Sequence, residues 1–135
     1  MKIIYNQSMS FRYLVIEDAA FIRELIKGVC RSAGGVCVGE SEGGPSAVEL
    51  VKQTLPDVVF LDLVLPGKNG VQLAGEIRTS WPEARLIACT SLDDSLIHQQ
   101  ALENGIDEIM MKPFTREKLI QTLDHQLSKR KEVAT

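Results

Sequence analysis

The segment Val58-Val59-Phe60-Leu61-Asp62 carries the clearest structural signal in this sequence. Its four uninterrupted apolar residues, rich in β-branched side chains, are typical of a strand that is covered on both faces inside a parallel sheet. Similar short apolar runs recur along the chain at 13–16, 36–38, 86–89 and 109–111. The sequence therefore predicts five short strands, most of them buried on both faces.

Between these runs lie segments whose apolar residues have helical spacing. The predicted helices are 19–33, 45–55, 70–80, 93–103 and 115–131. Gly34-Gly35 is a stop signal after the first helix, and Pro45 suits the first turn of the second. Asp93 and Thr115 are candidate N-caps of the last two helices. Strands that alternate with helices predict a doubly wound α/β sheet, because parallel neighbours need helical crossovers that cover both faces.

Composition narrows the class of protein. The chain has 135 residues, enough for one domain with its own core. Its net charge of −3 gives no basic field for a polyanion, so direct nucleic-acid binding is not expected. Three cysteines without CxxC spacing indicate reduced, structural thiols and hence a cytoplasmic protein. No apolar run approaches the roughly 18 residues of a membrane span, so we expect no membrane association.

Polar side chains follow four of the predicted strands. They are Glu17-Asp18 after the first, Asp62 after the third, Thr90-Ser91 after the fourth and Lys112 after the fifth. The carboxyl ends of parallel strands meet at one edge of a sheet, where the working site of such folds lies. Each residue alone also suits a turn or a helix cap. Their joint occurrence predicts a functional site at this edge.

Three gathered carboxylates repel one another, because a like-charged pair at about 4 Å costs on the order of 4 kcal/mol at an effective dielectric near 20. A hard divalent cation with oxygen ligands compensates for this, and few carboxylates with open positions suit Mg²⁺ better than Ca²⁺. We expect Asp18 and Asp62 to hold Mg²⁺, with Glu17 nearby. Lys112 and Thr90 would meet the oxygens of an incoming phosphoryl group.

In their order along the chain, these motifs resemble those of the receiver domains of bacterial two-component response regulators, and the single-domain chemotaxis-type members most of all. The resemblance also rests on the segment 62–70 around Asp62 and on Pro113-Phe114 after Lys112. It covers about residues 12–130 and places one receiver domain at 12–131. Residues 1–11 would form an N-terminal extension and residues 132–135 a C-terminal tail. If no output domain follows residue 131, the output would come from a separate protein; if the chain is a fragment, residues 132–135 would begin a linker.

The resemblance implies a flavodoxin-like sheet of strand order 2-1-3-4-5 with five helices, and Asp62 as phosphoacceptor. A sensor histidine kinase or a histidine phosphotransfer protein would donate the phosphoryl group, and an unidentified downstream protein would bind the product. Mg²⁺ (or Mn²⁺) would be held by Asp18, Asp62 and the backbone carbonyl of Val64, with Glu17 acting through water. Thr90, Ser91 and Lys112 would bind the phosphoryl oxygens. The Lys112-Pro113 bond would be cis.

Five positions depart from the family's pattern or set its chemistry. Glu17 stands where Asp is commonest, and Ser91 stands where Ala is usual. Ile109 occupies the position where many members carry a Tyr or Phe that moves inward on activation, so the readout would work differently. Val64 and Leu92 are apolar and would border the path of a hydrolytic water. We therefore expect slow spontaneous dephosphorylation.

Three other readings compete with a phosphorylated signalling domain. A haloacid-dehalogenase-type phosphatase also uses an Asp at a strand end, but it wants a second acid where Val64 stands. A flavin carrier of the same fold needs a phosphate-binding loop, where the acidic Glu17-Asp18 would repel phosphate. A pseudo-receiver that binds partners without phosphorylation is the remaining alternative. The chain is expected not to be an enzyme beyond its own phosphorylation and dephosphorylation.

Overall fold

A computed structural model describes residues 10–129 of the chain, and five parallel strands form its central sheet. Their order across the sheet is β2-β1-β3-β6-β7. This is the predicted order 2-1-3-4-5, so the flavodoxin-like doubly wound fold is confirmed. The strands are β1 (Phe11–Ile16), β2 (Gly35–Ser41), β3 (Val58–Asp62), β6 (Arg85–Thr90) and β7 (Glu108–Met111).

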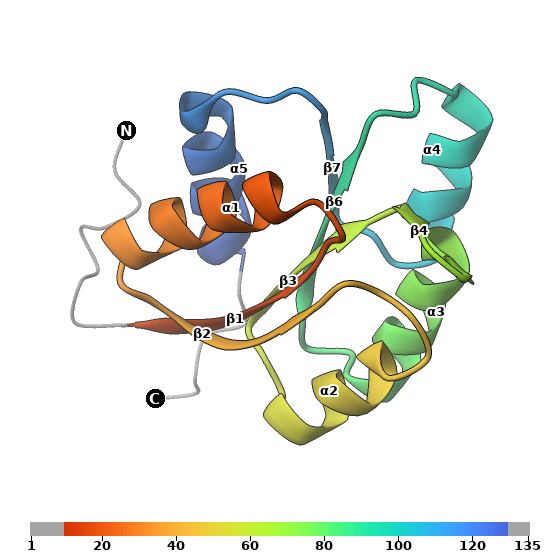
Figure 1. Cartoon of the computed structure of the whole chain (residues 1–135), viewed down its shortest axis with the longest axis horizontal. Helices are drawn as coiled ribbons and strands as arrows, with labels where there is room; N and C mark the ends of the chain where they lie inside the picture. The colour runs from red at the N-terminus through yellow and green to blue at the C-terminus, as the bar shows by residue number, and fades with distance from the viewer. Residues whose placement is uncertain (1–9, 130–135) are drawn as a thin grey trace.

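Five helices connect the strands and cover both faces of the sheet. They are α1 (Ala20–Ser32), α2 (Ala47–Thr54), α3 (Gly70–Ser80), α4 (Ser95–Glu103) and α5 (Arg116–Ser128). Helices α1 and α5 lie together on one side of the sheet, and α2, α3 and α4 lie on the other (Figure 1). None of the helices within residues 10–129 has the length and apolar character that a bilayer span requires.

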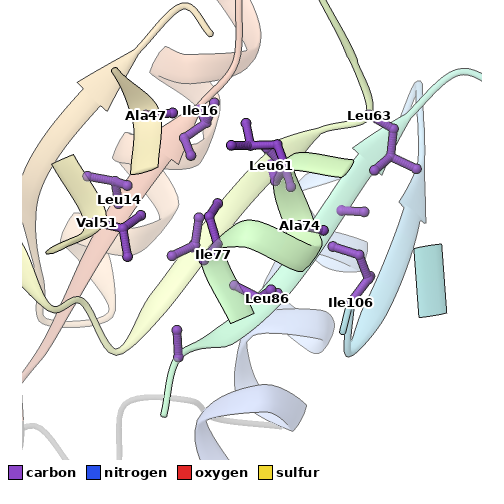
Figure 2. Packing of buried hydrophobic residues seen from close by; sticks show 14 of the residues in the cluster. Leu14, Ile16, Ala47, Val51, Leu61, Leu63, Ala74, Ile77, Leu86 and Ile106 are labelled. Atoms are coloured by element: carbon purple, nitrogen blue, oxygen red, sulfur yellow. The ribbon is translucent and has the colours of Figure 1, made fainter. Parts of the chain in front are cut away.

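The alternation of side chains along β3 divides the core into two clusters. Val59 and Leu61 belong to the cluster under α2, α3 and α4, whereas Val58 and Phe60 belong to the cluster under α1 and α5. Figure 2 shows the first cluster, in which side chains of the sheet face those of α2 and α3. All five residues of β3 are buried. This two-sided burial is the physical reason for the uninterrupted apolar run in the sequence.

The register of the sheet brings the ends of the strands level with one another. Ile16 of β1 pairs with Leu61 of β3, and Asp62 pairs with Cys89 of β6. Thr90 of β6 pairs with Met111 of β7. The residues that directly follow or end these strands therefore lie along one edge.

A two-stranded antiparallel hairpin was not predicted. It consists of β4 (Val64–Leu65) and β5 (Lys68–Asn69), joined by a turn in which Gly67 has a φ of +71°. Positive φ is open to glycine because it has no Cβ. The hairpin follows Asp62 in the chain and precedes α3, and its residues line one side of a groove next to the strand end.

Helix boundaries differ from the predictions at two N-termini. Helix α2 begins at Ala47 after Ser46, so Pro45 is not in its first turn. Helix α4 is capped by Asp94 and not by Asp93, because the Asp94 side chain accepts hydrogen bonds from the backbone N–H groups of Leu96 and Ile97. The predicted N-cap Thr115 and the cis Lys112-Pro113 bond are both present.

The proposed domain limits are not tested by the fold. Strand β1 already begins at Phe11, whose side chain is buried in the core. Residues 1–9 of the predicted extension lie outside the described part of the chain. The tail at 132–135 also lies outside it. The last helix, predicted to run to residue 131, ends at Ser128 with Lys129 as its C-cap, so its predicted end is wrong.

Candidate functional site

The first two acids of the site stand directly after β1 and have very different surroundings. Glu17 is only 1% exposed, whereas Asp18 is exposed. The backbone N–H of Glu17 donates to Ser41 O at 2.9 Å, and the guanidinium of Arg23 donates to Glu17 O at 2.8 Å. Ala19 N–H donates to the Glu17 side chain at 3.1 Å. Strand β2 and helix α1 thus fix the position of Glu17.

Asp62 ends β3 and is 4% exposed. Its Oδ1 accepts a hydrogen bond from the backbone N–H of Val64 at 2.9 Å, which holds the carboxylate at the start of the hairpin. Behind it, Gly70 N–H donates to Leu63 O at 3.1 Å and joins α3 to the same segment. The Asp62 carboxylate is therefore held by one backbone N–H, and the segment that follows it is fixed to α3.

Lys112 links the two buried acids. Its Nζ lies 3.0 Å from Glu17 Oε2 and 3.1 Å from Asp62 Oδ2. Burial lowers the pKa of the Lys112 ammonium, but the hydrogen bonds to both carboxylates outweigh burial and raise this pKa overall. The backbone N–H of Lys112 also donates to Thr90 O at 2.7 Å. Lys112 thus stays charged and joins the ends of β1, β3 and β6.

The three acids form a cluster with the chemistry of a cation site. One carboxylate oxygen from each of Glu17, Asp18 and Asp62 lies within 4.8 Å of the others. Glu17 Oε1 is fully buried and has no hydrogen-bond partner among the residues that the structure describes. Burial raises the pKa of Glu17 to about 7, above its ordinary value of 4.5. A single ammonium leaves the cluster short of positive charge, and an oxygen-binding dication fits that deficit.

The hydroxyl-bearing residues follow β6. Thr90 is fully buried, and its Oγ1 accepts a hydrogen bond from Leu92 N–H at 3.0 Å. Ser91 is exposed. A groove of about 460 Å³ adjoins this loop and is lined by Val64 and Leu92, among others. The two apolar residues expected to border the water path therefore face the same hollow.

The structure brings every predicted site residue to one edge of the sheet: Glu17, Asp18, Asp62, Val64, Thr90, Ser91 and Lys112. Ile109 is half-buried and packs against the cluster under α2, α3 and α4. Sequence reasoning missed the contacts of Arg23 with Glu17 and of His98 with Leu92 O, since both are set by tertiary structure. It also missed Phe21, which is 77% exposed at the start of α1.

Comparison with known proteins gives one consistent family. The family model of the response regulator receiver domain matches residues 13–124. The chain is 34% identical to the protein CcdB of Bacillus subtilis over 83% of this chain and 93% of that protein. It is 32% identical to the chemotaxis protein CheY of Thermotoga maritima over 86% and 97% of the two chains.

Solved structures agree with these matches. The signal receiver domain of the putative response regulator NarL from Mycobacterium tuberculosis superposes with a TM-score of 0.77 at 32% identity, over 87% of this chain and 97% of that one. The two-component response regulator of the LuxR family from Aurantimonas sp. SI85-9A1 superposes with a TM-score of 0.81 at 27% identity, over 91% and 89%. Sequence and structure thus point to the same group of proteins.

Proposed function

Because the chain belongs to the response regulator receiver domain family, we propose that Asp62 accepts a phosphoryl group from a phosphohistidine. A carboxylate oxygen of Asp62 attacks the phosphorus, and the bond between phosphorus and the donor's imidazole nitrogen breaks. The electron pair of that bond leaves with the imidazole, which can then take up a proton. The product is an acyl phosphate on this chain, a signalling domain and not a classical enzyme.

The contact of Lys112 Nζ with both Glu17 and Asp62 is the observation that carries this proposal. A lysine that is only a solvated turn residue has no reason to reach two buried carboxylates across 95 and 50 residues of sequence. In the proposed role, the ammonium neutralises the charge that an incoming phosphoryl group brings. The raised pKa of Lys112 keeps it protonated for this purpose.

The acidic cluster would hold Mg²⁺, or Mn²⁺ in its place, through Asp18, Asp62 and the Val64 carbonyl, with Glu17 acting through water. The orphaned Glu17 Oε1 supports this, because a buried carboxylate oxygen without a partner is costly. When bound, the ion would neutralise negative charge on the phosphoryl oxygens. The exposure of Asp18 leaves the cluster open to solvent and to a donor.

Thr90 and Ser91 would bind phosphoryl oxygens through their hydroxyl groups. The Thr90 hydroxyl hydrogen is not used in the bond from Leu92, where Oγ1 is the acceptor, so it is available for donation. Ser91 is small and exposed, which leaves access to the acceptor carboxylate. The backbone N–H of Lys112 donates to Thr90 O at 2.7 Å, which holds Lys112 and Thr90 side by side at the site.

A sensor histidine kinase or a histidine phosphotransfer protein is the proposed donor. The exposed ring of Phe21 at the start of α1, close in sequence to Glu17 and Asp18, offers an apolar contact for such a partner. Because relatives of this chain are chemotaxis proteins, we expect phosphorylation to change its affinity for a downstream protein. A cytoplasmic location goes with this role, because phosphohistidine donors obtain their phosphoryl group from ATP.

The experiment that tests the proposal is intact-mass analysis after incubation with acetyl phosphate and Mg²⁺. Wild type is expected to gain one phosphoryl group, and Asp62→Asn is expected to gain none. Asp93→Asn is the matched control, since Asp93 is an exposed acid in the loop before α4, and it should behave as wild type. Removal of Mg²⁺ with EDTA should abolish the gain. An unmodified wild type would reject the proposal in favour of a pseudo-receiver.

A further inference from the structure

The loop between β6 and α4 is tied to the helix that follows it by one side chain. His98, in the first turns of α4, has its Nε2 2.7 Å from the backbone carbonyl oxygen of Leu92. The N–H of the same Leu92 donates to Thr90 Oγ1 at 3.0 Å. Leu92 is thus held on its two backbone groups by two different side chains, one from the strand end and one from α4.

The direction of the His98 bond follows from chemistry. A carbonyl oxygen accepts and never donates, so His98 Nε2 carries the proton in this contact. The helix end that bears His98 is itself fixed, since Asp94 caps α4 and Asp94 O accepts the backbone N–H of His98 at 3.0 Å. The imidazole is therefore a short, directed link between a capped helix and the loop.

The position expected to hold an aromatic side chain that moves on activation is aliphatic in this chain. Ile109 stands where an aromatic side chain is common, and it packs into the core under α4. An aliphatic side chain offers no ring and no hydroxyl with which to respond to the site. Thr90 is fully buried, and hydrogen bonds through the Leu92 backbone connect its hydroxyl to His98 on α4.

We propose that His98 is a positioning residue that fixes Leu92 and, through it, the Thr90 hydroxyl, so that α4 responds when Thr90 binds a phosphoryl group. This inference rests on the proposed phosphoacceptor function. When the Thr90 hydroxyl turns toward a phosphoryl oxygen, the Leu92 N–H bonded to it moves along. The Leu92 carbonyl then carries the displacement to His98 and to the helix. His98 touches neither acceptor nor phosphoryl group, and it acts only through Leu92.

The test compares amide ¹H–¹⁵N chemical shifts with and without beryllofluoride and Mg²⁺, a probe that mimics a phosphoryl group on a carboxylate. In wild type, shifts are expected at Thr90 and Leu92 and along α4. In His98→Leu, which keeps the bulk but removes the donor, the shifts at Thr90 should persist and the response of α4 should be lost. His98→Gln, whose amide donates from a similar place, should restore it. Gln99→Leu, an exposed neighbour on the same helix, is the matched control and should respond as wild type.

The outcomes separate this inference from the function on which it rests. If wild-type Asp62 and Thr90 show no response to the probe, the phosphoacceptor proposal itself is wrong. If they respond, two outcomes reject only the role of His98. One is that α4 of His98→Leu responds as fully as in wild type, and the other is that His98→Gln does not restore a lost response. A measurement on wild type covers the case in which His98→Leu does not fold. The ¹⁵N shifts of the His98 imidazole should report a protonated Nε2 and should change with the probe; unchanged imidazole shifts overturn the inference.

Discussion

Gly70, the first residue of α3, leaves no room for a side chain beside the segment Asp62-Leu63. A Cβ at this position would collide with Leu63 Cα and would lie 2.6 Å from Leu63 O and 2.7 Å from Asp62 O. All three are backbone atoms, so no change of side-chain rotamer relieves the contact. Gly70→Ala must therefore shift α3 or the segment that carries Asp62.

The size of the effect follows from this geometry. Overpacking by a methyl group costs about 1–3 kcal/mol where neighbours can adjust, and backbone neighbours place this case at the upper end, near 3 kcal/mol. For a domain of this size, 1 kcal/mol lowers Tm by roughly 3–5 °C, so we expect a fall of about 10–15 °C. Any variant that remains folded should also accept phosphoryl groups more slowly, because Asp62 O is one of the displaced atoms.

Urea unfolding followed by circular dichroism measures the loss, with Gly28→Ala as the control. Gly28 lies within α1, and a Cβ at this position would meet no atom within 4 Å apart from its own helix and chain neighbours. Alanine there should stabilise the protein by about 0.5–1 kcal/mol through helix propensity. If the free energy of unfolding of Gly70→Ala lies within about 0.5 kcal/mol of the wild-type value, the close approach of α3 to the segment Asp62-Leu63 is wrong.

Three further outcomes are expected. Burial raises the pKa of Glu17 to about 7, so the folded state holds this proton more tightly than the unfolded state does. In EDTA, the free energy of unfolding of wild type should therefore fall relative to that of Glu17→Gln as pH rises from about 4.5 to 7. Urea unfolding at pH 5 and pH 7 checks this, and parallel changes in the two proteins would contradict it. Arg78→Ala should cost about 3 kcal/mol in the same assay, because the guanidinium donates to three backbone carbonyls and one carboxylate. Val64→Asn combined with Leu92→Glu should speed the decay of phosphorylated protein, because polar side chains at the groove admit and orient water; an unchanged decay rate in a mass-spectrometric time course would refute water exclusion.

The gathering of the site could be predicted from sequence because it depends only on topology. Once the apolar runs are recognised as parallel strands, Glu17, Asp62, Thr90 and Lys112 fall at the same edge whatever the details of packing. The exact loops do not alter this. The order of the strands came from the family resemblance, since strand periodicity alone does not say which strands are neighbours.

What could not be predicted depends on short or long-range contacts. The strands of the hairpin have two residues each, too few for any periodicity to be visible. Asp93 and Asp94 are equally good caps as residue types, and only the start of α4 distinguishes them. The contact of His98 with Leu92 O depends on the angle between a loop and a helix, which no local pattern encodes.

The presence of Glu17 in place of the more common Asp has a geometric reason in this structure. Its Oε2 accepts hydrogen bonds from Ala19 N–H at 3.1 Å and from Lys112 Nζ at 3.0 Å, while its backbone is held by Ser41 O. An aspartate is shorter by one methylene, so the same backbone position would bring its carboxylate less far toward Lys112. The longer side chain satisfies the ammonium with one oxygen and leaves Oε1 in the buried cluster, where the proposed cation and its water shell would provide the missing partner.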